Sequence, residues 1–171
     1  LDYYDLVTEL YNSQKKYSII WQENYADKDA VSNFINMCID ASTINLTIKT
    51  ISAYRSYEYQ KNLYDKYLLE DELNIVDTYS ARAGHSEHQT GLAFDIYNVK
   101  KSYTEFKETN EYKWVKDNAH RYGFIIRYTK EFEYITGYKS EEWHIRYVGI
   151  DASTYIYNHN ITLEEYILNK K

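Results

Sequence analysis

Residues 84–96 read GHSEHQTGLAFDI, and this stretch decides both the fold and the position of the site. Its apolar second half predicts a β-strand over residues 92–99, with Asp95 inside it. Because side chains alternate between the two faces of a strand, Asp95 points away from its apolar neighbours. A carboxylate in an apolar strand is costly unless it is paired or bound to a metal. Gly91 permits a tight turn between His88 and the strand, so the side chains of His88 and Asp95 can converge on one point.

A second stretch, EEWHIRY at residues 141–147, places His144 in another predicted strand. Two neutral imidazoles and one carboxylate then form a set of three ligands. Such a set leaves the fourth position of a zinc ion open for water, as hydrolytic zinc sites require. A further acid must accept a proton from that water, and Glu141 is the candidate. Strand alternation alone would instead place the adjacent Glu142 on the face of His144.

The same residues also fit a purely structural interpretation. In that interpretation Asp95 pairs with Arg82 or Arg127, and the histidines pack in the core. Spacing alone does not separate this interpretation from a zinc site. Two further histidines, His120 near a predicted helix end and His159 in an Asn-rich turn, are expected to lie outside any site.

Helical periodicity predicts several helices around these motifs. Near the start, Leu6, Leu10 and Tyr11 form a weak helical stripe. A second helix is capped by Asp29 and has its buried side at 31–39, and a third is capped by Ser56 and carries the apolar residues Tyr59, Leu63, Tyr67 and Leu68. A further helix over 111–121 ends at Gly123, and two closing helices are capped by Asp151 and Thr162. Alternation predicts further strands over 46–53, 124–128 and 143–148. Helices that come first and strands that follow predict an α+β fold with a small, largely antiparallel sheet and helices packed around it.

Length and composition exclude several classes of protein. The 171 residues correspond to one domain, 1–171, which we expect to be a monomer. The net charge of −6 argues against a nucleic-acid partner, since such modules usually show a basic face. No apolar run approaches the ~18 residues that a membrane span needs. The single cysteine, Cys38, excludes an internal disulfide and a multi-cysteine metal site, and we expect it to be an inert core thiol.

The motifs resemble those of a known enzyme family. The pattern SxHxxGxAxD at 86–95, followed by ExWH at 141–144, resembles the signature of the VanY-type D-alanyl-D-alanine carboxypeptidases. These belong with the LdcB-type L,D-carboxypeptidases to a group of zinc peptidases that shares its fold with the hedgehog signalling domain. The resemblance extends upstream to SAYRS at 52–56 and downstream to RYVG at 146–149, so that it covers roughly positions 46–150.

The resemblance implies a role for each of seven residues. The zinc ligands would be His88, Asp95 and His144. Glu141 would be the general base, and Arg55 would be the arginine that stabilises the carbonyl oxygen in the transition state. Gln60 and Ser86 would bind the terminal part of the substrate. The family commonly has proline at the position of Glu142, which favours Glu141 as the base, and a turn before Trp143 would reconcile this with strand alternation.

The implied activity is zinc-dependent removal of the C-terminal D-alanine from peptidoglycan stem peptides. One alternative is an L,D-carboxypeptidase that acts on tetrapeptide stems. Another is a catalytically silent zinc module that binds cell wall or a protein, although the retention of Glu141 and Arg55 argues against it. A plain structural domain is the third. The implied location is extracellular or in the cell envelope. The chain begins at Leu1 without an apolar leader, so a signal peptide or membrane anchor, which the implied location calls for, would belong to a longer precursor of this chain.

Overall fold

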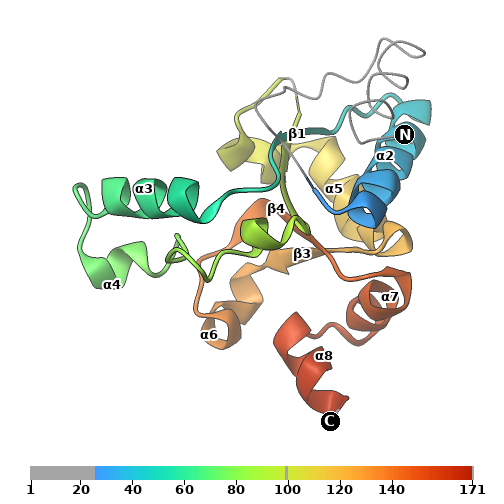
Figure 1. Cartoon of the computed structure of the whole chain (residues 1–171). Coiled ribbons are helices and arrows are strands. Elements are labelled where there is room, and N and C mark those ends of the chain that lie inside the picture. Colours follow the sequence, from blue (N-terminus) through green and yellow to red (C-terminus); the bar gives the residue numbers. More distant parts are fainter. Residues whose placement is uncertain (1–25, 99, 171) are drawn as a thin grey trace.

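The structure is a computed structural model that describes residues 26–98 and 100–170 of the chain. At its centre lies one sheet of four antiparallel strands in the order β1-β2-β4-β3 (Figure 1). The strands are β1 (Lys49–Ser52), β2 (Ala93–Tyr97), β3 (Phe124–Tyr128) and β4 (Glu141–Tyr147). This arrangement confirms the expected α+β fold with a small antiparallel sheet.

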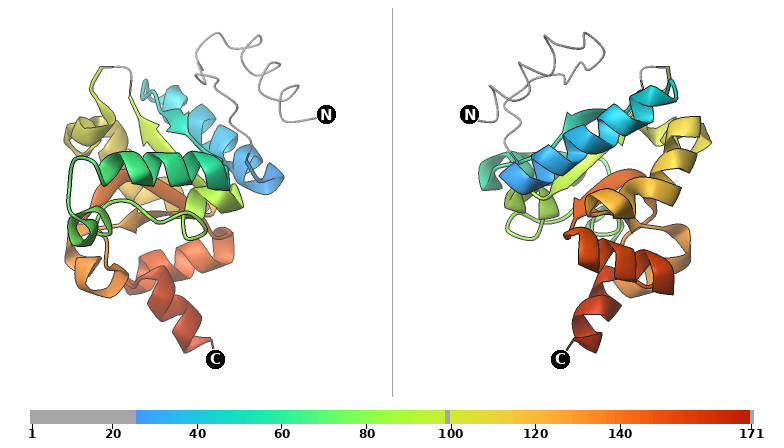
Figure 2. Two further views of the ribbon diagram at one scale, coloured as in Figure 1. Left: turned by 60° about the vertical axis from the view of Figure 1, so that its left-hand side comes forward. Right: turned by 90° about the vertical axis from the view of Figure 1, so that its right-hand side faces the viewer.

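Helices surround the sheet, and the two closing helices lie at the C-terminal end of the molecule (Figure 2). The α-helices are α2 (Lys28–Thr43), α3 (Tyr57–Tyr67), α4 (Leu73–Val76), α5 (Asn110–Asn118), α6 (Glu133–Thr136), α7 (Ile150–His159) and α8 (Leu163–Asn169). The short 3-10 helices are η1 (Glu87–Thr90), η2 (Tyr103–Glu108), η3 (Ala119–Tyr122) and η4 (Lys130–Phe132).

The hydrophobic core lies between the sheet and the helices α2 and α5. Phe34 of α2 stacks on Phe94 of β2 with ring centroids 5.0 Å apart, and Phe124 of β3 meets Phe34 edge-on at 6.2 Å. Val115 of α5 is fully buried in the same cluster. Cys38 is a free, buried thiol in this core, and burial raises its pKa. The prediction of a buried core thiol is therefore confirmed.

The caps of α2 and α7 differ from the sequence prediction. Asp27, not Asp29, caps α2, because its carboxylate accepts hydrogen bonds from the backbone N–H groups of Asp29 (3.0 Å) and Ala30 (3.1 Å). Asp29 already lies inside the first turn, where its side chain cannot reach those amides. Asp151 also lies inside the first turn of its helix and makes no capping bond. Thr162 is confirmed as the cap of α8, in a capping box.

Helix α3 confirms its predicted cap, and its buried side is formed by residues other than the apolar ones named from the sequence. The Ser56 hydroxyl accepts a hydrogen bond from the backbone N–H of Tyr59 (3.1 Å). Tyr59 itself is 59% exposed, whereas Gln60 and Tyr64 are buried. The Tyr64 hydroxyl donates to Asp77 at 2.5 Å, which fixes the inward face of the helix. A tyrosine tolerates water through its polar tip, so tyrosine periodicity was a weak guide to burial here.

Strand boundaries follow the prediction with local changes. Strand β3 is as predicted, whereas β1 and β2 are shorter and β4 begins two residues earlier. Before β1, the backbone N–H of Thr47 donates to the side chain of Glu111 on α5, not to a neighbouring strand. The helical stripe at residues 6–11 lies outside the described residues. Within the described ranges, no helix has the length and apolar character needed to cross a membrane.

Candidate metal centre

The pairing of β2 with β4 brings two of the three predicted ligands, Asp95 and His144, together. Asp95 lies directly opposite His144 in the antiparallel register, so both side chains share one face of the sheet. Their neighbours Phe94 and Ile145 form the next pair and are buried on the other face. The alternation predicted for β2 thus separates the core from the site.

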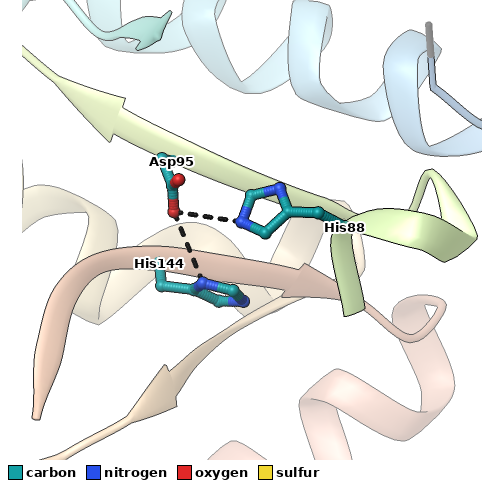
Figure 3. Close-up of side chains that lie close together, drawn as sticks. All are labelled: His88, Asp95 and His144. Carbon is teal, nitrogen blue, oxygen red and sulfur yellow. Dashed lines mark ion pairs between the residues drawn. The ribbon is translucent and has the colours of Figure 1, made fainter. Parts of the chain in front are cut away.

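The turn before β2 supplies the third candidate ligand. His88 lies in η1, and Gly91 ends η1 in the left-handed conformation with φ 72°. A Cβ atom at Gly91 would lie 3.0 Å from the backbone nitrogen of Asp27, so the close approach of two backbones also favours glycine. This turn confirms the role predicted for Gly91, because it returns His88 over the face that carries Asp95 (Figure 3).

The three side chains form a cluster of the size that a metal ion needs. The Oδ1 atom of Asp95 lies 3.3 Å from Nε2 of His88 and 3.4 Å from Nδ1 of His144 (Figure 3). Tetrahedral zinc with bonds of about 2.0–2.1 Å has its ligand atoms about 3.3–3.4 Å apart. All three residues are at most 5% exposed. Their spacing, burial and atom types therefore fit zinc.

Two polar atoms at this centre have no hydrogen-bond partner among the described residues. Within the described residues, Nε2 of His88 and Oδ1 of Asp95 are buried and have no hydrogen-bond partner. The Nδ1 atom of His88 lies 2.5 Å from the carbonyl oxygen of Ala53 and donates its proton there. The lone pair of His88 Nε2 therefore faces Asp95 and is free for a metal. Unpaired buried atoms of this kind are costly unless something binds them.

Burial and charge set the protonation of the three candidate ligands. Burial lowers the pKa of His88, which favours the neutral imidazole. Burial alone would raise the pKa of Asp95, but the two histidines and Arg55 hold that pKa well below its usual range. Burial would lower the pKa of His144, but Asp95, Glu141 and Glu87 together raise it well above its usual value. The site thus carries an ionised carboxylate and attracts positive charge.

Glu141 lies beside the three candidate ligands without being one of them. Its Oε2 atom is 3.4 Å from Nδ1 of His144. The register between β3 and β4 shifts here, because Ile126 pairs with Ile145 but Tyr128 pairs with Glu141. Three residues of β4 therefore lie across from one residue of β3, which is a bulge. The expected turn before Trp143 is wrong, since the strand continues through this position and the bulge changes the alternation.

Glu142, the adjacent acid, lies close enough to Tyr112 to affect its pKa. Burial and the Glu142 carboxylate raise the pKa of Tyr112, which lies on α5 and packs against the hydrophobic core. No ion pair joins Glu142 to a candidate ligand among the described residues. Of the two adjacent acids, Glu141 is therefore the one that the fold brings to the metal centre.

Arg55 supplies positive charge next to the candidate ligands. Its guanidinium forms an ion pair with Asp95, and its Nε donates to the hydroxyl of Ser52 at 2.9 Å. The expected alternative pairing of Asp95 with Arg82 or Arg127 is wrong. Arg82 pairs with Asp77 on the surface, and Arg127 pairs with two glutamates described below.

The two predicted substrate-binding residues are buried polar groups. Gln60 of α3 is 1% exposed, and its side-chain nitrogen donates to the carbonyl oxygen of Ala81 at 2.7 Å. Its Oε1 atom has no hydrogen-bond partner in the described part of the chain. Ser86 is 8% exposed and directly precedes η1, which carries His88. Their contact with a substrate remains a prediction.

The other histidines lie elsewhere. His85 and His159 are exposed. His120 stacks on Tyr157 with ring centroids 3.9 Å apart, in the contact between η3 and α7. These positions agree with the expectation that His120 and His159 lie outside the site.

Glu87 is a residue of this region that the motif analysis did not single out. It lies 3.5 Å from His144 and pairs with Arg127 and Arg146. Burial would raise the pKa of Glu87, but His144 and the two arginines lower it to about 2. The sequence could have indicated Glu87 through its position directly before His88, because a residue adjacent to a candidate metal ligand lies near the same site.

Comparison with known proteins places these motifs in a family. The sequence model of the D-alanyl-D-alanine carboxypeptidase family VanY matches residues 23–150, which include both motifs. YodJ of Bacillus subtilis (strain 168) is 42% identical over 149 residues, which make up 85% of this chain and 54% of YodJ. The chain spans about half the length of several curated relatives that it matches.

Solved structures show the same fold. The LD-carboxypeptidase LdcB is 37% identical with a TM-score of 0.81, over 88% of this chain and 74% of LdcB. A vancomycin-resistance D,D-pentapeptidase VanY, solved in complex with Zn(II), is 31% identical with a TM-score of 0.75, over 91% of this chain and 92% of that protein. The metal in the second structure agrees with a zinc centre at the clustered side chains described here.

Proposed function

This chain belongs to the VanY family of D-alanyl-D-alanine carboxypeptidases, and from this premise we propose that it is a zinc-dependent carboxypeptidase that removes the C-terminal D-alanine from peptidoglycan stem peptides. The observation that carries the proposal is the convergence of two histidines and an aspartate beside a further acid, Glu141. Zinc binding alone needs neither Glu141 nor Arg55, so both favour an enzyme over a silent zinc module. Such an enzyme acts outside the cell or in the cell envelope, where peptidoglycan lies.

The residues that would hold zinc are His88, Asp95 and His144. Zinc, when bound there, supplies Lewis acidity that makes water acidic near neutral pH and polarises a carbonyl group. The chain prepares the site in advance, because the Ala53 carbonyl fixes the tautomer of His88. Asp95 is held ionised, so no proton has to leave it before the metal binds.

Glu141 is the general base in this proposal. Its carboxylate accepts a proton from water while the water oxygen bonds to the carbonyl carbon of the scissile peptide. The same group then donates that proton to the nitrogen of the leaving D-alanine as the carbon–nitrogen bond breaks. The Glu141 side chain is 15% exposed, so it is open to a substrate while its orientation is fixed by the bulge.

Arg55 stabilises the developing negative charge on the carbonyl oxygen. The positive charge of its guanidinium lies against Asp95 and therefore beside the reacting group. Gln60 and Ser86 bind the terminal part of the substrate, and the unpartnered Oε1 of Gln60 supplies an acceptor for an N–H group of the substrate. This assignment follows the resemblance of both residues to the family motif, and both residues lie within the range that matches the family.

A second candidate is L,D-carboxypeptidase activity on tetrapeptide stems. The similarity to LdcB, at a TM-score of 0.81, favours it. Both reactions use the same chemistry at the metal, and they differ in the chirality of the residue before the scissile bond. The residues of the metal centre therefore serve either substrate, and specificity depends on the side chains that contact the stem.

Mass spectrometry of muropeptides tests the proposal. Purified pentapeptide and tetrapeptide muropeptides are incubated separately with the zinc-loaded protein, with a chelator-treated sample as control. Loss of one alanine from the pentapeptide supports the D,D-activity, and loss from the tetrapeptide alone supports the L,D-activity. No cleavage of either muropeptide by protein that has bound zinc would favour the silent module.

A further inference from the structure

The two ring nitrogens of His144 face different groups. Nδ1 lies 3.4 Å from the carboxylates of both Asp95 and Glu141 and thus faces the metal centre. Nε2 points the other way and lies 3.5 Å from Oε2 of Glu87. Within the described residues, neither this nitrogen nor this oxygen has a hydrogen-bond partner, although both are buried. Each is therefore the available partner of the other.

A metal at Nδ1 fixes where the proton of His144 must be. A neutral imidazole carries one proton, so ligation through Nδ1 requires that Nε2 carries it and donates it. Glu87 Oε2 is the acceptor at that position. His88 shows the complementary arrangement, since its Nδ1 donates to the Ala53 carbonyl and its Nε2 faces the centre. Both histidines thus have an acceptor on the nitrogen remote from the centre.

Two arginines hold Glu87 in this orientation. Its other oxygen, Oε1, lies 2.8 Å from Nε of Arg127 and 3.2 Å from Nη1 of Arg146. Both arginines come from the sheet, Arg127 from β3 and Arg146 from β4. Because they occupy Oε1, the oxygen that remains for His144 is Oε2. These two contacts fix the orientation of the Glu87 carboxylate.

Arg127, which contacts Glu87, also pairs with a residue of the last helix. The two terminal nitrogens of Arg127 bind both oxygens of Glu164, at 2.5 and 3.1 Å. Glu164 lies in the first turn of α8, which is held by the capping box of Thr162. The Arg127 side chain is 8% exposed and the Glu164 side chain is 34% exposed, so the pair is shielded from water on the arginine side and open to it on the glutamate side. Helix α8 lies beyond residue 150, where the match to the family ends.

We propose that Glu87 is a positioning residue that orients His144 for metal binding, and that Arg127 and Glu164 of α8 hold Glu87 in place. The proposal rests on the proposed zinc site but not on the identity of the substrate. A carboxylate that accepts a proton from a metal-bound histidine fixes the ring and raises its basicity. Loss of such a partner typically weakens metal binding about 10–100-fold.

The zinc dissociation constant of E87Q tests the proposal, measured by competition with a chromophoric chelator. An amide has one oxygen and one NH₂ group, and the two arginines require the oxygen. The NH₂ group then faces Nε2 of His144 and favours the tautomer with the proton on Nδ1, where the metal binds. We expect the dissociation constant to rise about 10–100-fold. The matched control is E133Q, because Glu133 is also a partly buried, ion-paired acid and makes its contacts with Lys130 and Ser140.

A spectroscopic measurement separates positioning from a general loss of stability. Cobalt(II) replaces zinc, and the visible spectrum of E87Q is expected to change in band position or intensity, whereas that of E133Q is not. E164Q leaves Glu87 itself intact and is expected to weaken zinc about tenfold, at the lower end of the same range. If E87Q does not fold, the zinc dissociation constant of E164Q tests the proposal in its place.

Distinct outcomes overturn the two proposals. A folded E87Q with an unchanged dissociation constant and cobalt spectrum overturns the positioning role of Glu87. An unchanged dissociation constant in E164Q overturns the contribution of α8. If the unmutated protein binds no zinc, the proposed function itself fails. If it binds zinc and cleaves no stem peptide, the proposed carboxypeptidase activity fails and the role of Glu87 in zinc binding stands.

Discussion

The bulge in β4 leads to a specific prediction about two adjacent acids. Glu141→Gln is expected to keep the fold and the zinc, because the side chains have nearly the same shape and Glu141 lies outside the cluster of three candidate ligands. The amide cannot accept a proton from water, so hydrolysis should nearly stop. The loss of a positioned general base costs about 10²–10⁴-fold in rate. This corresponds to about 2.7–5.4 kcal/mol of activation free energy.

The adjacent variant Glu142→Gln is the matched control. Glu142 acts on Tyr112 beside the core and has no ion pair with the candidate ligands among the described residues. A substitution away from the site changes free energies by about 0.5 kcal/mol or less, which is a factor of about two in rate. Both variants therefore remove one negative charge at neighbouring positions, but only Glu141→Gln is expected to lose activity.

The assay follows the release of D-alanine from a stem pentapeptide, with zinc content measured on the same samples. We expect kcat to fall in Glu141→Gln while zinc remains at the level of the unmutated protein. An inactive Glu142→Gln beside an active Glu141→Gln would refute the assignment of the base and leave the zinc ligands standing. Two active variants would refute the mechanism as a whole.

Three further predictions concern the metal, the transition state and the fold. His88→Ala should lose most of the zinc in metal analysis, whereas His85→Ala should keep it because His85 is exposed, and full zinc occupancy in His88→Ala would contradict the ligand assignment. Arg55→Ala should retain zinc but slow turnover about 10²–10³-fold, and a near-normal rate would reduce Arg55 to a partner of Asp95. Asp27→Ala should lower the free energy of unfolding by about 1 kcal/mol in urea denaturation, while Asp27→Asn should change it little because Asn caps equally well; equal stabilities of the two variants would contradict the observed cap.

The sequence predicted the part of the site that depends on local geometry. Asp95 in an apolar strand and Gly91 before it were sufficient to expect that His88 would fold back over the strand. The pairing of Asp95 with His144 depends on the register of two strands separated by some fifty residues, and this register cannot be read from alternation alone. The family motif supplied that link before the structure did.

Other features required the three-dimensional structure. The alternation argument pointed to Glu142, because a bulge depends on the partner strand and not on the residues of β4 alone. The cap of α2 was placed two residues too late, because two nearby aspartates both suit the role and only one reaches the free amides. The chain of contacts from Glu87 through Arg127 to Glu164 joins three distant segments, so no local pattern could indicate it.

A zinc titration of the metal-free protein tests the central claim most directly. Zinc is added in steps to a known concentration of protein, and the release of D-alanine from a stem pentapeptide is followed at each step. The account predicts that the rate rises in proportion to zinc and levels off at about one equivalent per chain, in keeping with a single site of three ligands. A rate that does not depend on zinc, or a site that fills with one equivalent while no stem peptide is cleaved, would contradict it.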